Sequence, residues 1–108
     1  MQHWLLLAVA IAFEVAGTTS MKLSEGFTKI VPSVLIFVFY TASFTAFTLA
    51  LKKIEVSIAY AIWAGAGTAL IAAIGIIYFR ETATTLKFIS ILLIIVGVVG
   101  LNLNSAKH

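Results

Sequence analysis

Strongly apolar runs, each long enough to cross a lipid bilayer, occupy most of this 108-residue chain. Hydrophobic residues make up 62% of it and charged residues only 10%, too few to cover the surface of a water-soluble globule. Charged and turn-forming connections separate four runs, which we expect to be helices at about residues 4–21, 31–51, 57–79 and 87–104, with a short polar tail from Asn102 on. The sequence therefore predicts an all-α, four-transmembrane-helix bundle that forms a single integral membrane domain, residues 1–108.

Composition argues against several kinds of chemistry. The chain has no cysteine, which excludes disulfides, thiolate metal sites and cysteine nucleophiles. Its two histidines lie near opposite ends, and no metal-ligand spacing or glycine-rich phosphate loop occurs. We therefore expect no metal, no cofactor and no enzyme activity. The net charge of +3 comes from basic residues scattered singly or in one pair, a pattern that does not suggest nucleic-acid binding.

One acidic residue, Glu14, interrupts the first apolar run. A charge at mid-membrane depth costs about 2.5–3.5 kcal/mol on insertion scales, so such residues usually face an aqueous cavity and mark an ion or proton path. The alternative is a structural carboxyl group that hydrogen-bonds to a neighbouring helix. Ala10, Gly17 and Thr18 share the helical face of Glu14, which makes its surroundings narrow and polar. Glu14 is therefore the first candidate for function.

Aromatic residues in the second and third runs indicate what a carboxylate could bind. Tyr40 lies near the middle of the second run, and Tyr60 and Trp63 share a face of the third. Ring faces attract cations, so these rings with Glu14 would suit a lipophilic organic cation. The alternative is that the rings only fill the bundle. Ser43 is a further candidate, as a hydrogen-bond donor either to a carboxylate or to the helix backbone.

Small residues in the third run predict close helix packing, because Gly65 belongs to a stripe at four-residue intervals with Ala61, Ala69 and Ala73. Gly65 and Gly67 also make the middle of this helix a candidate bend, with a straight helix as the alternative.

Basic residues are nearly balanced between the two sides of the membrane. Four spanning helices place Lys22, Lys29, Arg80 and Lys87 on one side, and Lys52, Lys53 and Lys107 on the other. The distribution of lysine and arginine between the two sides sets the orientation of a protein in the membrane. Because this distribution is nearly even, it favours neither orientation strongly, which would permit an antiparallel dimer. Unequal weighting of these positions would instead restore a single orientation.

Several segments, at residues 14–22, 24–29, 32–33 and 59–67, closely resemble the small multidrug resistance transporters, and the likeness extends over essentially the whole chain. It implies an antiparallel, dual-topology homodimer in the bacterial inner (cytoplasmic) membrane that exchanges protons for cationic substrates. By this resemblance Glu14 is the shared proton and substrate site, and protons are the coupling ion. The candidate pocket comprises Tyr40, Tyr60 and Trp63, which the resemblance implies, with Gly17, Thr18 and Ser43.

The resemblance also assigns roles in movement and assembly. It implies that Gly65 and Gly67 let the third helix bend during alternating access. The fourth run resembles the dimerisation segment of the family, with Ile94 and Gly97 as packing residues. Ser90 stands where a glycine is often found, and we include it among the packing residues.

The dipeptide Gly17-Thr18 resembles the multidrug, quaternary-ammonium branch, whereas guanidinium exporters usually carry a tryptophan near Ala16. We therefore favour export of lipophilic and quaternary ammonium cations. The alternatives within the family are a guanidinium/proton exporter and a polyamine exporter, whose members form heteromeric pairs. The alternatives of another class are a cation channel and a structural membrane subunit.

Overall fold

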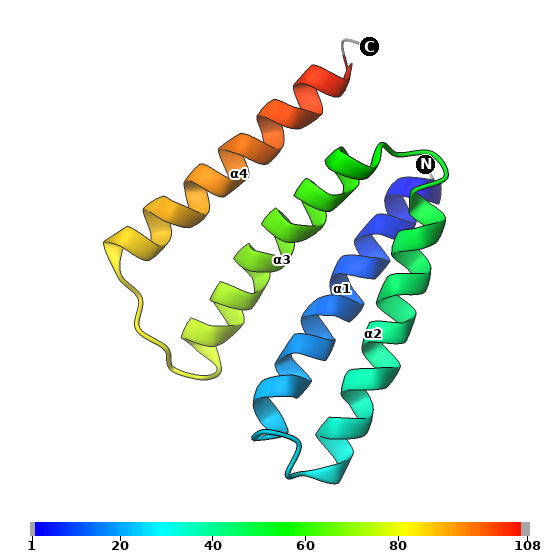
Figure 1. The fold of residues 1–108 in the computed structure, drawn as a ribbon. Coiled ribbons are helices and arrows are strands. Elements are labelled where there is room, and N and C mark those ends of the chain that lie inside the picture. Colours follow the sequence, from blue (N-terminus) through cyan, green and yellow to red (C-terminus); the bar gives the residue numbers. More distant parts are fainter. Residues whose placement is uncertain (1, 107–108) are drawn as a thin grey trace. The chain divides into compact units, whose positions relative to one another are not determined.

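Four α-helices joined by short connections form the computed structural model, which describes residues 2–106 and, for 104–106, the backbone alone (Figure 1). The helices are α1 (Gln2–Leu23), α2 (Ile30–Ala50), α3 (Val56–Ile77) and α4 (Thr85–Ala106). All four are long and apolar enough to cross a membrane. At about 1.5 Å per residue, their length matches a hydrocarbon core of about 30 Å. The predicted all-helical class with four membrane-spanning segments is therefore confirmed.

The end of the chain differs from the expected polar tail. Helix α4 continues through Asn102 to Ala106, so the tail is helical as far as the structure describes it, while Lys107 lies outside the described residues. After Gly100 no proline or glycine interrupts the chain, so nothing in the sequence ends the helix when it leaves the apolar region. The helix expected to end at about residue 104 thus runs two residues further and includes the first residues of the polar tail.

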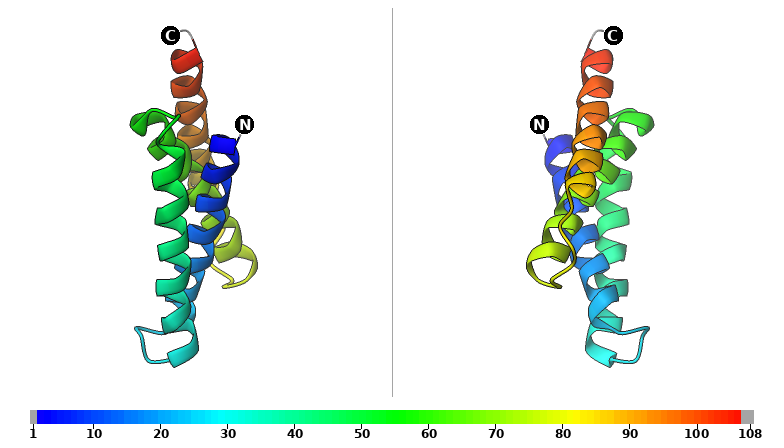
Figure 2. Two further views of the ribbon diagram at one scale, coloured as in Figure 1. Left: turned by 90° about the vertical axis from the view of Figure 1, so that its right-hand side faces the viewer. Right: turned by 90° about the vertical axis from the view of Figure 1, so that its left-hand side faces the viewer.

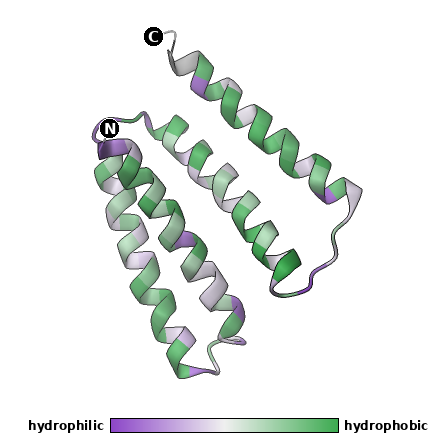
Figure 3. Cartoon of the chain, turned by 180° about the vertical axis from the view of Figure 1, so that it is seen from behind, coloured by the Kyte–Doolittle hydropathy of each residue, from purple (hydrophilic) through white to green (hydrophobic). Residues whose placement is uncertain are grey.

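Most large apolar side chains are exposed on the outside of the helices, and only a minority are buried. None of the residues in the most apolar part of α4, Thr85–Leu103, is buried. Figure 3 shows hydrophobic colouring along all four helices and hydrophilic colouring mainly at their ends and in the connections. This pattern suits a protein whose solvent is lipid, because hydrocarbon chains accept exposed apolar side chains at no cost.

The chain divides into two compact helical hairpins, α1–α2 and α3–α4 (Figures 1 and 2). In the first hairpin, Ile36, Ser43 and Ala50 of α2 are buried at seven-residue intervals, as are Ala10 and Gly17 of α1. This is the repeat that keeps one seam of each helix facing its partner. Small residues at most of these positions allow the two backbones to approach closely.

Ser24 organises the turn between α1 and α2. Its buried hydroxyl donates to the carbonyl oxygen of Met21 at 2.8 Å and accepts from the N–H of Phe27 at 3.2 Å. The three residues that follow, Glu25, Gly26 and Phe27, have φ angles of 49°, 71° and 68°, the left-handed region that disfavours side chains. The two hydrogen bonds of Ser24 thus hold the turn in a conformation that its residues adopt at a cost.

Glu25 is an exposed charge in the turn between α1 and α2. Lys29 Nζ lies 2.6 Å from Glu25 Oε2, and both side chains are exposed. The hydrogen bond and positive charge of Lys29 lower the pKa of Glu25, and the carboxylate raises the pKa of Lys29 in return. At an exposed site such a pair adds little to stability.

In the second hairpin, α3 packs against α4 through Gly65. A Cβ atom at Gly65 would lie 2.7 Å from Cγ2 of Val98 and 3.4 Å from Cγ2 of Ile94. The predicted use of Gly65 for close packing is therefore confirmed. Helix α3 is continuous across Gly65 and Gly67, so a bend at these residues stays a prediction about movement.

Glu81 closes the end of α3. Its N–H donates to the carbonyl oxygen of Gly75 at 2.9 Å, and its carboxylate lies where a side chain at Gly75 would otherwise begin. Arg80, with a φ of 58°, turns the chain back at this point. Helix α4 then starts after Thr84, whose Oγ1 accepts a hydrogen bond from the Lys87 N–H at 3.1 Å and caps the helix.

Substitution of Gly65 tests the packing of the second hairpin. We expect Gly65→Ala to lower the free energy of unfolding by about 1–3 kcal/mol, because the added methyl group overlaps Val98. Val98→Ala in the same chain should restore most of the loss. Gly100→Ala is the control, since a Cβ there has no neighbour within 4 Å among the described residues. Circular dichroism during unfolding in mixed micelles measures the effect, and equal stabilities of Gly65→Ala and Gly100→Ala would contradict it.

Candidate functional site

The carboxyl group of Glu14 lies near the middle of α1, thirteenth of its 22 residues. Its Oε1 accepts a hydrogen bond from the hydroxyl of Thr18 at 2.9 Å. Its Oε2 is buried and has no hydrogen-bond partner within residues 2–106. A buried carboxylate oxygen without a partner is costly, so this atom is ready to bind a proton or a positively charged group.

Thr18 connects the carboxyl group to the second helix. The hydroxyl oxygens of Thr18 and Tyr40 lie 2.5 Å apart, which joins α1 to α2 by a hydrogen bond. The Tyr40 hydroxyl also lies 3.9 Å from the Met21 sulfur atom. Glu14, Thr18, Tyr40 and Met21 thus form one continuous polar chain on the first hairpin.

Gly17 makes this arrangement possible. A Cβ atom at Gly17 would lie 2.9 Å from two ring carbons of Tyr40 and 3.4 Å from the Cβ of Phe39. Only a residue without a side chain lets the Tyr40 ring lie against α1 and reach Thr18. Next to it, Phe39 stacks on Phe13 with ring centroids 6.0 Å apart. The structure therefore brings together Glu14 and three predicted site residues, Gly17, Thr18 and Tyr40.

Ser43 makes a different contact. It is fully buried, and its hydroxyl donates to the backbone carbonyl oxygen of Ala10 at 2.6 Å, one helical turn before Glu14. The structure thus shows a backbone partner for Ser43, but on α1 rather than within its own helix. Its assignment to the substrate pocket stays a prediction.

The remaining aromatic candidates belong to the second hairpin. Tyr60 and Trp63 pack edge to face on α3, with ring centroids 5.6 Å apart and planes at 88°. The Tyr60 side chain is 59% exposed, which leaves most of its surface open to a ligand, to lipid or to another chain. Their part in cation binding stays a prediction.

The predicted dimer-packing residues lie on α4. Ser90, Ile94 and Gly97 are all exposed. Ile94 lies beside Gly65 within the same hairpin, whereas a Cβ at Gly97 would meet nothing within 4 Å in the described chain. This leaves Gly97 open to close approach by another helix, and a role in dimer packing stays a prediction for all three.

Sequence reasoning missed Met21 and Phe39 as neighbours of the site. Met21 follows Glu14 by seven residues and therefore shares its helical face, a pattern that could have pointed to it. Phe39 precedes Tyr40 in α2, and nothing in the sequence indicates that it packs beside Gly17 and Phe13.

Four membrane-spanning helices, and a carboxyl group near the middle of one of them with only one oxygen hydrogen-bonded within the described residues, are features typical of a small membrane transporter. The family model described as Small Multidrug Resistance protein matches residues 2–94. The uncharacterized membrane protein YvaE of Bacillus subtilis is 55% identical over 101 residues, covering 94% of this chain and 85% of YvaE.

The names of two further relatives state the kind of compound to which they confer resistance. The quaternary ammonium compound-resistance protein QacF of Klebsiella aerogenes is 47% identical, over 97% of this chain and 96% of QacF. The multidrug resistance protein EbrB of Bacillus subtilis is 44% identical, over 98% of this chain and 91% of EbrB. The chain belongs to the small multidrug resistance family, a family of exporters rather than enzymes, and is a multi-pass protein of the bacterial inner membrane.

Substitution of Thr18 tests the polar chain. We expect Thr18→Val to lower the free energy of unfolding by about 1–3 kcal/mol, because it leaves Glu14 Oε1 and the Tyr40 hydroxyl without the partner they share. Thr18→Ser, which keeps the hydroxyl group, is the matched control. A double-mutant cycle with Tyr40→Phe should give a coupling energy of about 1 kcal/mol. Strictly additive effects of the two substitutions would show that no hydrogen bond joins the helices here.

Proposed function

We propose that this protein is a proton-coupled antiporter that exports lipophilic and quaternary ammonium cations and works as an antiparallel, dual-topology homodimer. The observation that carries the proposal is the state of Glu14, which has one oxygen bonded to Thr18 and the other buried without a partner among the described residues. The free oxygen can be satisfied by a proton or by a cationic substrate. Because one negative charge serves both, binding of one displaces the other.

The hydrogen-bond chain offers a way for neighbouring side chains to respond to this exchange. When Glu14 is ionised it can only accept, so Thr18 donates to it and Tyr40 donates to Thr18. When Glu14 is protonated it can donate to Thr18, which then donates to Tyr40, and the Tyr40 hydroxyl is free to turn to Met21. The Tyr40 hydroxyl would thus have a different hydrogen-bond partner in each charge state of Glu14. We propose that the ring of Tyr40 contacts the substrate.

The cation class follows from the aromatic residues and from the relatives. A desolvated ring face contributes about 2 kcal/mol or more to binding a cation, and it binds a quaternary ammonium group that cannot donate hydrogen bonds. Tyr40, Tyr60 and Trp63 are the rings we propose for this role. The name of QacF supports quaternary ammonium compounds as substrates, and that of EbrB supports more than one drug.

The near balance of basic residues supports assembly in both orientations. Lys22 and Lys29 flank the first connection, and Arg80 lies in the third, which four spans place on the same side of the membrane. With Lys87 this side has four basic residues, which the three on the opposite side, Lys52, Lys53 and Lys107, nearly offset. The exposed apolar surface of α4 and the open surface of Gly97 are where we propose that two chains pack.

Transport in proteoliposomes tests the proposal. A proton gradient should drive uptake of a quaternary ammonium cation by the wild-type protein, and Glu14→Gln should lower this uptake by about 100-fold, because it removes the charge for which proton and substrate compete. Trp63→Ala should weaken binding of an aromatic cation by about 3- to 30-fold and leave guanidinium less affected.

Two other outcomes would change the proposed substrate class or contradict the proposal. Transport of guanidinium or spermidine alone would move the protein to another branch of the family, and equal transport by wild type and Glu14→Gln would contradict the proposal. Saturable counterflow, in which one labelled cation accumulates against another, separates an antiporter from a cation channel. Lys22→Gln is a control that keeps the site intact and should transport normally.

Insertion in both orientations can be measured because the natural chain contains no cysteine. A single cysteine at the exposed loop position Thr82 (Thr82→Cys) should react with a membrane-impermeant maleimide in about half of the copies in intact cells, since the weak charge bias directs neither orientation. Thr82→Cys combined with Lys52→Gln and Lys53→Gln should shift this fraction strongly. Labelling from one side alone in the unmodified background would contradict dual topology.

A further inference from the structure

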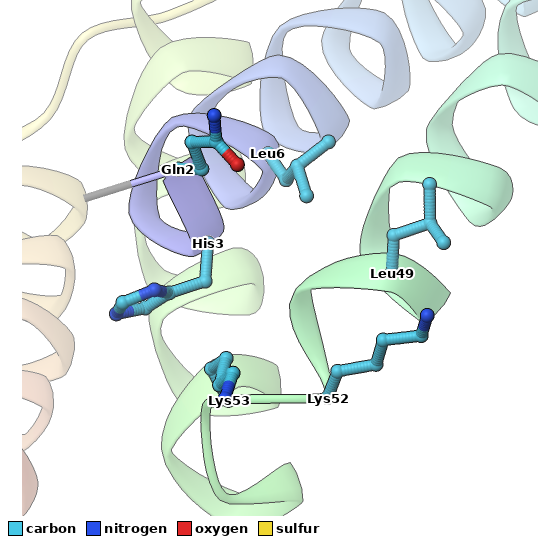
Figure 4. A pocket seen from close by; sticks show the side chains of 6 residues that line it. All are labelled: Gln2, His3, Leu6, Leu49, Lys52 and Lys53. Atoms are coloured by element: carbon cyan, nitrogen blue, oxygen red, sulfur yellow. The ribbon is translucent and has the colours of Figure 1, made fainter.

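An open pocket of about 440 Å³ lies at one end of the first hairpin, away from Glu14. Figure 4 shows side chains from two places in the chain around it. The first turns of α1 supply Gln2, His3 and Leu6, and the end of α2 with the turn after it supplies Leu49, Lys52 and Lys53. The exchange of proton and cation at Glu14 proposed above uses none of these residues.

The lining has two chemically distinct parts. The ammonium groups of Lys52 and Lys53, the His3 ring and the Gln2 amide can all donate hydrogen bonds to an anion. No carboxylate lines the pocket, and neither lysine forms an ion pair within the part of the chain that the structure describes. The leucine side chains provide an apolar wall beside these donors. Such a pocket fits a ligand that is anionic at one end and hydrocarbon at the other.

Its position in the fold places this pocket at the membrane surface. The apolar span of α1 begins at Gln2 and that of α2 ends at Ala50, so the basic residues stand where the hydrocarbon core meets the headgroups. Lysine side chains near helix ends extend to the headgroup level while their methylene groups stay in apolar surroundings. Basic pockets between membrane helices at this depth suit anionic lipid headgroups.

We propose that this pocket binds an anionic phospholipid. Lys52 and Lys53, with His3, hold the headgroup phosphate, and an acyl chain runs along Leu6 and Leu49. The apolar wall favours a lipid over free inorganic phosphate, which would gain nothing from it. The inference concerns a surface apart from Glu14 and stands or falls independently of the transport proposal.

Trp4 provides a reporter next to the pocket. Its ring contacts that of His3, with centroids 5.7 Å apart, and Trp63 is the chain's other tryptophan. The full chain carrying Trp63→Phe is reconstituted into vesicles of equal parts phosphatidylglycerol and phosphatidylcholine. In one sample only the phosphatidylglycerol is brominated near the glycerol end of its acyl chains, and in the other only the phosphatidylcholine. Both samples have the same surface charge, so a difference in Trp4 quenching reports lipid choice.

We expect brominated phosphatidylglycerol to quench Trp4 more strongly. Lys52→Gln with Lys53→Gln should lower the relative association constant for the anionic lipid by about 30-fold, because each of the two lysines near the surface contributes about 1 kcal/mol to anionic lipid binding. Lys22→Gln with Lys29→Gln is the matched control, since it removes the same charge at the opposite end of the hairpin. Circular dichroism verifies that both double variants are folded.

Four outcomes would overturn the proposal. These are equal quenching by the two lipids in the unaltered pocket, a preference that survives Lys52→Gln with Lys53→Gln, a preference lost equally in the control variant, and a preference abolished by excess inorganic phosphate. The last would identify a site for free anions instead of a lipid.

Discussion

The lack of water in the bilayer core governs every feature of this structure. Backbone polar groups must find partners within the chain, which leaves helices as the form for each apolar run. Apolar side chains have no reason to withdraw from their surroundings, so α4 carries none that is buried between Thr85 and Leu103. Association of helices then depends on close packing, which small residues such as Gly17 and Gly65 permit. The same constraint makes a carboxyl group at mid-depth expensive, so that Glu14 needs a partner from the protein or from a ligand.

Within the described residues, the first hairpin provides a hydrogen-bond partner for only one of the two oxygen atoms of Glu14. Thr18 satisfies one oxygen of Glu14 and at the same time bonds to Tyr40 on the other helix, while the second oxygen stays buried without a partner in the described structure. A fully satisfied carboxylate would be a structural element, and an isolated one would be difficult to keep in the membrane. A carboxylate with one hydrogen-bonded and one unpartnered oxygen lies between these extremes, and it suits a group that binds and releases a proton or a cation. Gly17 is as important to it as the polar residues, because a side chain there would keep the Tyr40 ring away from α1.

Much of the fold follows from local properties of the chain. The four helices lie within two residues of their predicted bounds, because the length of an uncharged run sets the length of a spanning helix. The polar tail that begins at Asn102 continues α4 to Ala106, since polarity ends a membrane span but does not end a helix. At the site, the bond from Thr18 to Glu14 follows from their four-residue spacing. The bond from Ser43 to Ala10 does not, because it depends on the register of α2 against α1.

The sequence by itself determined the class of protein, the number of spans, the family and the importance of Glu14, since each depends on residue type and spacing along one helix or on similarity of the whole chain. Only the tertiary structure decided which side chains of α2 reach α1. It placed Tyr40 on Thr18, left one oxygen of Glu14 without a partner among the described residues, and brought His3 close to Lys52 and Lys53 around a pocket. The physical reason is that contacts between helices depend on register, rotation and the space left by single glycines, and a one-dimensional pattern of apolar and polar residues does not specify these.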